Sequence, residues 1–248
     1  MHKGDKRKAD ILSAAGGLFG VKGYHKTTLQ DIIEQVGCSK GSFYHHFESK
    51  LQVLQALANQ RVEKDHRAYA DGALPQGLDK LNRLLYFTCP WRQGEESFMA
   101  QVLSLSLQQE GAVITAHLRE ARKQAFYPEL LTLLQALRDQ ELAYFSRGSL
   151  PELLWDTHMA FADTLTAEIC RLIISGGTPA SRALEMLGTA RFQWERLLDL
   201  PFGSVDIVPA QELLAAMEAA CGRLCLEDEQ LRFDSGFAAP CQQGVKTL

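Results

Sequence analysis

Residues 27–50 read TTLQDIIEQVGCSKGSFYHHFESK and predict two short helices followed by the first turn of a third. The first helix has apolar residues at the i, i+3, i+4 and i+7 spacing of one buried face. These residues are Leu29, Ile32, Ile33 and Val36. Thr27 or Thr28 can cap this helix, because each is followed three residues later by a side chain that completes a capping box. Gly37 ends it, since glycine accepts the left-handed backbone common after a helix.

A second helix is predicted to follow Ser39, whose hydroxyl can cap it. Phe43 and Phe47 lie one turn apart and are expected to face inward. The residues left outside are Lys40, Gly41, Ser42, Tyr44, His45 and His46. Ser49 and Gln52 form a further capping box that opens the next helix. A helix, a tight turn and a helix with a polar, aromatic and basic outer face are typical of a helix-turn-helix that reads the major groove of DNA.

The same stretch resembles the N-terminal DNA-binding domain of the TetR family of bacterial repressors, whose pattern is roughly T-T-v-x-x-I-A-x-x-A-G-V-S-x-G-x-x-Y-x-H-F-x-S-K. The matching positions are Thr27, Thr28, Gly37, Ser39, Gly41, Tyr44, His46, Phe47, Ser49 and Lys50. The chain departs from the pattern at Ile33, Val36 and Cys38, which are inward positions where we expect local repacking. The resemblance covers about the first quarter of the chain. The remainder resembles the family in being helical and of suitable length.

The outer face of the second helix contains the candidate base contacts. Lys40 can donate to O6 and N7 of guanine, and Ser42 can bond with either type of base. Gly41 allows the backbone to approach the duplex closely. Thr27 and Thr28, at a helix N-terminus, can direct hydroxyl and backbone N–H groups at a phosphate.

The resemblance implies roles for three more of these residues. Tyr44 would touch a phosphate or a thymine methyl group, while His45 and Lys50 would hold phosphates. For each single contact, a solvated polar surface remains an equal alternative. His45 and His46 are adjacent on a helix and point about 100° apart, so they are not expected to chelate a metal.

The composition is that of an ordinary soluble globular protein, with 46% hydrophobic and 23% charged residues among 248. No uninterrupted apolar run approaches the roughly 20 residues needed to span a bilayer. The first residues, MHKGDKRKAD, are charged and contain no signal-peptide core. We therefore expect a cytoplasmic protein with no membrane partner.

The six cysteines show no paired CxxC arrangement. Cys221 and Cys225 lie one helical turn apart, a spacing that a redox pair or half of a metal site could use. No histidine or acidic cluster completes such a site, so ordinary packing is favoured and neither a metal nor a cofactor is expected.

The net charge of −4 is unevenly distributed. Residues 1–50 contain eight Lys and Arg against five Asp and Glu, whereas the other 198 residues contain 18 basic and 25 acidic groups. A basic N-terminal segment followed by an acidic remainder is consistent with a DNA-binding domain joined to a larger domain that does not bind DNA.

The whole chain is predicted to be all-α. Residues 1–50 would form the DNA-binding domain, after an arm at residues 1–8 that is either mobile or in transient contact with phosphate. A connector helix at 49–70 would lead to an effector-binding and dimerisation domain at 71–232, and the tail at 233–248 would be disordered. Other helices are expected at about 7–22, 77–88, 97–109, 112–138, 151–175, 179–199 and 209–226. Pro128 would bend or split the helix at 112–138.

The body contains many aromatic residues, and some of them could surround an effector. The candidates for a pocket are Trp91, Phe98, Phe126, Trp155, His158 and Phe161. The alternative is that these residues are simply core. The resemblance implies a dimer interface on two late helices within residues 151–200. The apolar stripes there are Leu165, Ile169, Leu172 and Ile173, then Leu184, Leu187, Arg191 and Trp194. Burial within the chain and between chains are both open.

These features favour a homodimeric transcriptional regulator, usually a repressor, that binds a pseudo-palindromic operator and is released by a small-molecule effector. An effector-independent helical DNA-binding protein is the alternative. An enzyme is disfavoured, because the chain contains no Ser-His-Asp arrangement, Gly-rich phosphate loop, zinc-ligand spacing or convincing carboxylate pair.

Overall fold

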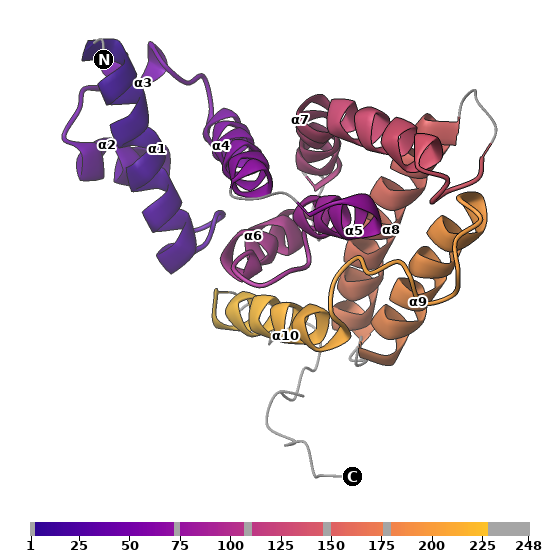
Figure 1. The fold of residues 1–248 in the computed structure, drawn as a ribbon. Helices are drawn as coiled ribbons and strands as arrows, with labels where there is room; N and C mark the ends of the chain where they lie inside the picture. Colours follow the sequence, from indigo (N-terminus) through magenta and orange to yellow (C-terminus); the bar gives the residue numbers. More distant parts are fainter. Residues whose placement is uncertain (1–2, 72–74, 107–110, 146–149, 176–179, 228–248) are drawn as a thin grey trace.

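The computed structural model describes residues 3–71, 75–106, 111–145, 150–175 and 180–227, and these form an all-α fold without strands (Figure 1). The helices are α1 (Lys3–Lys22), α2 (Leu29–Val36), α3 (Lys40–Tyr44), α4 (Lys50–Ala70), α5 (Gly77–Thr88), α6 (Glu96–Ser106), α7 (Gly111–Asp139), α8 (Leu150–Ser175), α9 (Ala180–Leu197) and α10 (Ala210–Glu227). Among these helices, none has the length and apolar character needed to cross a membrane.

The helix positions agree closely with the sequence pattern, with two differences. Helix α1 begins at Lys3, so the basic residues before Asp10 form its first turns instead of a mobile arm. Asp5 lies in the first turn, where a carboxylate complements the helix dipole. Helix α7 continues through Pro128 and is not split there. The tail at 233–248 lies outside the described residues.

One continuous hydrophobic core runs from the small N-terminal bundle into the body. Ile11, Phe19 and Phe43 are buried in the bundle, and Tyr24 packs beneath it with its ring 5.2 Å from that of Phe19. Helix α4 lies between α1–α3 and the body helices (Figure 1) and buries side chains along its whole length, from Val53 to Tyr69. Helix α4 therefore connects the two parts by packing as well as by sequence. Cys89 and Cys170 are also buried in this core, as ordinary packing predicts.

Candidate functional site

Helix α2 is capped by Thr28, which the structure selects over Thr27. The Asp31 N–H donates to the Thr28 hydroxyl at 3.1 Å, and the Thr28 N–H donates to the Asp31 carboxylate at 2.8 Å. This reciprocal pair is a capping box. Gly37 ends the helix with φ of 64°, in the left-handed region that glycine adopts without strain. The turn between α2 and α3 is thus built from the residues that its sequence pattern indicated.

Asp31 also fastens α2 to the end of α1. Its carboxylate lies 3.0 Å from Nζ of Lys22. The hydrogen bond from the Thr28 backbone, followed by the bond from Lys22, lowers the pKa of Asp31 to about 2. The carboxylate therefore stays charged across the whole physiological range and orients α2 relative to α1.

Helix α3 buries its phenylalanines and exposes its polar face. The Ser39 hydroxyl accepts from the Ser42 N–H at 3.2 Å and caps the helix. Phe43 and Phe47 are buried, with ring centroids 6.1 Å apart. Outside, Lys40, Gly41, Tyr44 and His45 are exposed, and Ser42 is half-buried. These five residues are therefore accessible for the predicted contacts with DNA.

Gly41 has free space around it in the protein. A Cβ atom added there would meet only the Ser39 hydroxyl oxygen, at 4.0 Å. The packing of the domain therefore does not require glycine at this position. This supports the prediction that Gly41 serves the close approach of an external surface.

Two residues predicted to contact DNA form hydrogen bonds within the domain. Thr27 is buried and its hydroxyl donates to the Gly23 carbonyl at 2.7 Å. Nζ of Lys50 donates to the carbonyls of Tyr24 at 2.7 Å and Thr27 at 3.0 Å. The turn between α1 and α2 leaves these carbonyls without helical partners, and Thr27 and Lys50 supply the donors. Both side chains therefore have a structural role in this arrangement, and their contact with phosphate stays a prediction.

Thr28 keeps only part of its predicted role. It is exposed, but its backbone N–H is already bonded to Asp31. Its hydroxyl oxygen accepts from the Asp31 N–H, which leaves the hydroxyl proton for an outside acceptor.

The residues predicted to surround an effector are packed in the core of the body. Trp91, Phe98, Phe126, Trp155, His158 and Phe161 are all buried. Phe126 packs against Tyr69 at 5.8 Å, and the indole N–H of Trp91 donates to Thr166 at 3.1 Å. Phe98 differs from the others in lining a surface cleft of about 240 Å³ between α1, α4 and α6. The structure therefore favours the core alternative for the other five.

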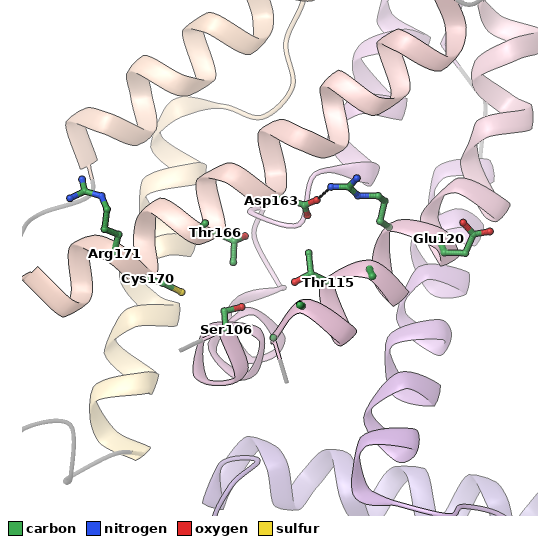
Figure 2. Close-up of a pocket in the computed structure, with 12 residues that line it drawn as sticks. Ser106, Thr115, Glu120, Asp163, Thr166, Cys170 and Arg171 are labelled. Carbon is green, nitrogen blue, oxygen red and sulfur yellow. Dashed lines mark hydrogen bonds and ion pairs between the residues drawn. The ribbon is translucent and has the colours of Figure 1, made fainter. Parts of the chain in front are cut away.

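A larger groove lies between α7, α8 and the end of α6, with a volume of about 750 Å³ (Figure 2). Arg119 and Asp163 form an ion pair that joins α7 to α8 across this groove, and a dashed line at Asp163 marks it in Figure 2. Thr115, Thr166 and other small or polar residues form the rest of its wall. None of the predicted pocket residues lines it. A search of the sequence for aromatic clusters could not find this groove, because its lining is not aromatic.

Four charged residues form a network between α4 and the segment that joins α5 to α6. Arg92 lies 2.5 Å from Asp65 and 3.6 Å from Glu95. Arg61 pairs with Glu95 and donates to the Gly94 carbonyl at 2.9 Å. Asp65, Arg92 and Glu95 are buried, so the ties between α4 and the body are shielded from solvent.

His158 is held neutral in the core. Burial, with the nearby charge of Arg122 as a second cause, lowers its pKa to about 3. The Thr88 hydroxyl donates to the Leu84 carbonyl at 2.8 Å and lies 2.8 Å from Nε2 of His158. The proton therefore belongs on Nε2, and Nδ1 is an acceptor with no partner among the described residues.

The apolar stripes proposed for a dimer interface are largely buried within the chain itself. Leu165, Ile169, Leu187 and Trp194 pack inside the protomer, so of the two open alternatives the structure favours burial within the chain for these four residues. The side chain of Ile173 lies outside the described residues. Elsewhere on α9, Leu184 and Phe192 are exposed, with Gly188 one turn from each.

Comparisons with known proteins give different results for sequence and for fold. Residues 11–57 match the family model described as bacterial regulatory proteins, tetR family. The chain is 34% identical over 90 residues to YfiR of Bacillus subtilis, named an uncharacterized HTH-type transcriptional regulator, over 36% of this chain and 38% of that protein. It is 36% identical over 59 residues to the HTH-type transcriptional activator FasR of Mycolicibacterium smegmatis, over 24% of this chain and 27% of that one.

The similarity of fold covers more of the chain than the similarity of sequence does. The structure of GusR from Salmonella enterica has a TM-score of 0.53 at 16% identity, over 80% of this chain and 98% of that one. In sequence, however, the chain spans only 38% of the first curated relative and 27% of the second. The family model therefore covers residues 11–57, whereas the similarity of fold to GusR extends over 80% of the chain.

Proposed function

We propose that this chain, whose residues 11–57 form a DNA-binding domain of the tetR family of bacterial regulatory proteins, is a cytoplasmic transcriptional repressor that acts as a homodimer. The observation that carries this proposal is the arrangement of α3. Its phenylalanines are buried, while Lys40, Gly41, Tyr44 and His45 share its exposed surface. Such a face can enter a major groove and contact base edges and phosphates.

Two copies of the domain would read a pseudo-palindromic operator. In a two-fold dimer, the α3 helices lie in successive major grooves, about 34–36 Å apart. Residues 1–50 would read DNA, α4 would transmit changes in its orientation, and residues 71–232 would bind the effector and the second subunit. The buried ties of α4 to the body support this division, because they couple the connector to any movement of the body.

The second subunit would pack on the exposed sides of α8 and α9. Leu184, Gly188 and Phe192 form a stripe at i, i+4 and i+8 on α9. Ala160 and Ala167 are exposed on α8, where small side chains allow close helix packing. A face of this kind is self-complementary in a two-fold interface.

An effector would release the operator by favouring a state in which the distance between the two DNA-binding domains does not match the distance between the operator half-sites. A coupling of about 1–3 kcal/mol between the effector and DNA sites would suffice. The second candidate is an effector-independent DNA-binding protein, and the packing of the predicted pocket residues into the core favours it. The two candidates differ in whether any small molecule changes the affinity for the operator.

The test begins with selection of an operator from random DNA by the purified protein. The proposal expects a two-fold symmetric sequence with half-sites about one helical turn apart. It also expects a reporter gene under this operator to be silenced by the protein. Selection of an asymmetric sequence would contradict the dimeric reading mode, and activation of the reporter would contradict repression. Failure to bind any DNA would contradict the proposal as a whole.

A further inference from the structure

Phe202, in the segment between α9 and α10, projects into solvent and is 90% exposed. Phe192 on α9 is 50% exposed, and both phenylalanines line one cleft of about 580 Å³. Gly188 and Pro209 line the same cleft. A single exposed aromatic side chain is ordinary on a protein surface, but two beside one cleft form a patch of the kind that binds another protein. We refer to these four residues as the α9 patch.

The backbone that carries Phe202 is fixed in place from two sides. The carboxylate of Glu195 on α9 is buried and accepts hydrogen bonds from the N–H groups of Gly203 at 2.8 Å and Val205 at 3.2 Å. From α5, the side chain of Asn82 bonds to two further backbone groups of this segment, at 3.1 and 2.9 Å. A ring on a fixed backbone loses little conformational freedom when a partner covers it. Phe202 is therefore suited to act as an anchor in an interface.

Gly188 leaves room in the cleft. A Cβ atom added there would meet no heavy atom within 4 Å. Glycine within a helix is less favourable than alanine, and the packing around Gly188 does not require it. Because Gly188 lies one turn before Phe192, the small residue opens the helix surface next to that ring. An aromatic side chain from outside can therefore lie directly on the backbone of α9.

The charges around the α9 patch favour a second copy of this chain as the partner. Arg196 lies beside Phe192, with its guanidinium carbon 5.9 Å from the ring centroid, and 3.9 Å from Asp199. Asp206 lines the cleft and is also exposed. A rim with both signs of charge complements a copy of itself in a two-fold contact, whereas its acidic groups repel DNA and anionic lipid. Since α9 lies across the body from α1–α3 (Figure 1), the patch is also separate from the DNA-binding domain.

We propose that Phe202 of each subunit inserts into the partner's α9 patch and packs against the partner's Phe192. This rests on the homodimer proposed above, in which α8 and α9 form the interface, and it adds the segment between α9 and α10. The two-fold axis makes the contact occur twice, so that four aromatic rings are buried. Aromatic anchors buried in pockets contribute a large share of the binding energy in many interfaces. The cleft of each subunit is therefore completed by a residue of its partner.

Photo-crosslinking of the full chain tests this contact directly. The photoreactive analogue p-benzoylphenylalanine replaces Phe202, and a mixture of isotopically light and heavy protein is irradiated. Mass spectrometry then identifies peptides that join a light chain to a heavy one. We expect crosslinks from position 202 to residues 188–196 of the partner. The same analogue in place of Tyr144, which is 60% exposed, is the control and should give no such crosslink.

Two variants change the contact in opposite chemical senses. Phe202→Asp removes the anchor, whereas Gly188→Leu fills the cleft and makes the surface more apolar. Each should weaken the dimer by about 30-fold or more in sedimentation velocity experiments over a concentration series. A patch that adheres only through its apolar character would associate more strongly in Gly188→Leu. Gly17→Leu is the matched control, because Gly17 is an exposed glycine of α1 where an added Cβ meets no heavy atom within 4 Å.

Several results would overturn the proposed contact. Crosslinks from position 202 that are absent between chains, or that reach other parts of the partner, would do so. Crosslinks to residues 228–248 of the same chain would show that its own C-terminal segment covers Phe202. A dimer dissociation constant that either variant leaves unchanged would also overturn the contact. Circular dichroism checks the fold of both variants, and the crosslink decides the question if one of them does not fold.

Failure of this contact can be distinguished from failure of the proposed function. A dimer that both variants leave intact would overturn the role of Phe202 and leave the interface of α8 and α9 in place. A monomeric wild-type protein would overturn this contact together with the proposed homodimer. A dimer that shows the expected crosslinks and binds no operator would overturn the proposed regulatory function and keep the contact.

Discussion

Nζ of Lys50 lies 2.7 Å from the Tyr24 carbonyl oxygen and 4.1 Å from the centroid of the Tyr24 ring. The first residue of α4 is thereby tied to the turn between α1 and α2, 26 residues earlier in the chain. This contact gives Lys50 a structural role at a position that the resemblance assigns to phosphate binding. The two roles can be separated by experiment.

Substitution of Lys50 by methionine should destabilise the protein by about 1.5–3 kcal/mol, because two carbonyls lose a charged donor. Urea denaturation measures this loss. The salt dependence of operator binding should keep the slope of wild type. A stable variant whose slope falls by about 1 would instead identify Lys50 as a phosphate ligand.

Tyr44 is 52% exposed on α3, and Tyr144, which is 60% exposed in the body, is its matched control. Tyr44→Ala should weaken operator binding by about 1–3 kcal/mol, since a groove contact is lost, and should leave the Tm unchanged. Tyr144→Ala should change neither quantity. Gel shifts and thermal melts of the two variants provide the comparison. Equal operator affinity of Tyr44→Ala and wild type would contradict the assignment of α3 to the groove.

Gly41→Ala tests whether glycine serves the protein or its partner. The free protein has room for the methyl group, and alanine favours a helix by roughly 1 kcal/mol. We expect a folded protein of equal or greater stability that binds the operator more weakly. Circular dichroism melts and a binding titration measure the two effects. Unchanged operator affinity would show that the duplex does not approach Gly41 closely.

Asp31 should make the small domain sensitive to acid. Its pKa falls from 3.8 to about 2 on folding, so its contribution to stability is fully present above about pH 4. That contribution is lost as the pH falls from about 4 towards 2. Asp31→Asn should therefore be less stable than wild type at neutral pH, and the difference should shrink over this range. Urea melts at a series of pH values measure the difference, and a constant gap between pH 5 and 2 would exclude this linkage.

Phe192 is 50% exposed on the proposed interface, and Leu131 on α7 is a control of comparable exposure, at 42%. Phe192→Asp should convert the dimer into a monomer, because it buries a charge against an apolar partner. Leu131→Asp should remain dimeric. Analytical ultracentrifugation distinguishes the two states. A dimeric Phe192→Asp protein would place the subunit interface elsewhere.

Local structure was readable from the sequence because its causes are local. The inward position of Phe43 and Phe47, the caps at Ser39 and Ser49, and the end of α2 at Gly37 all follow from residues within two turns of one another. The same reasoning left Thr27 and Thr28 as equal candidates for one cap. Both fit the capping box, and only the packing of the Thr27 hydroxyl onto Gly23 distinguishes them.

Contacts between distant segments were decided only by the tertiary structure. Aromatic spacing could not tell whether Trp155 and His158 face a pocket or a core, because periodicity reports burial and not what covers the buried face. The partners of Lys50 come from a turn more than 20 residues away, and the network around Asp65 joins α4 to the segment after α5. The buried position of Arg122 near the carboxylates of Asp65 and Glu95 is likewise a tertiary feature, because it depends on which side chains the fold brings together.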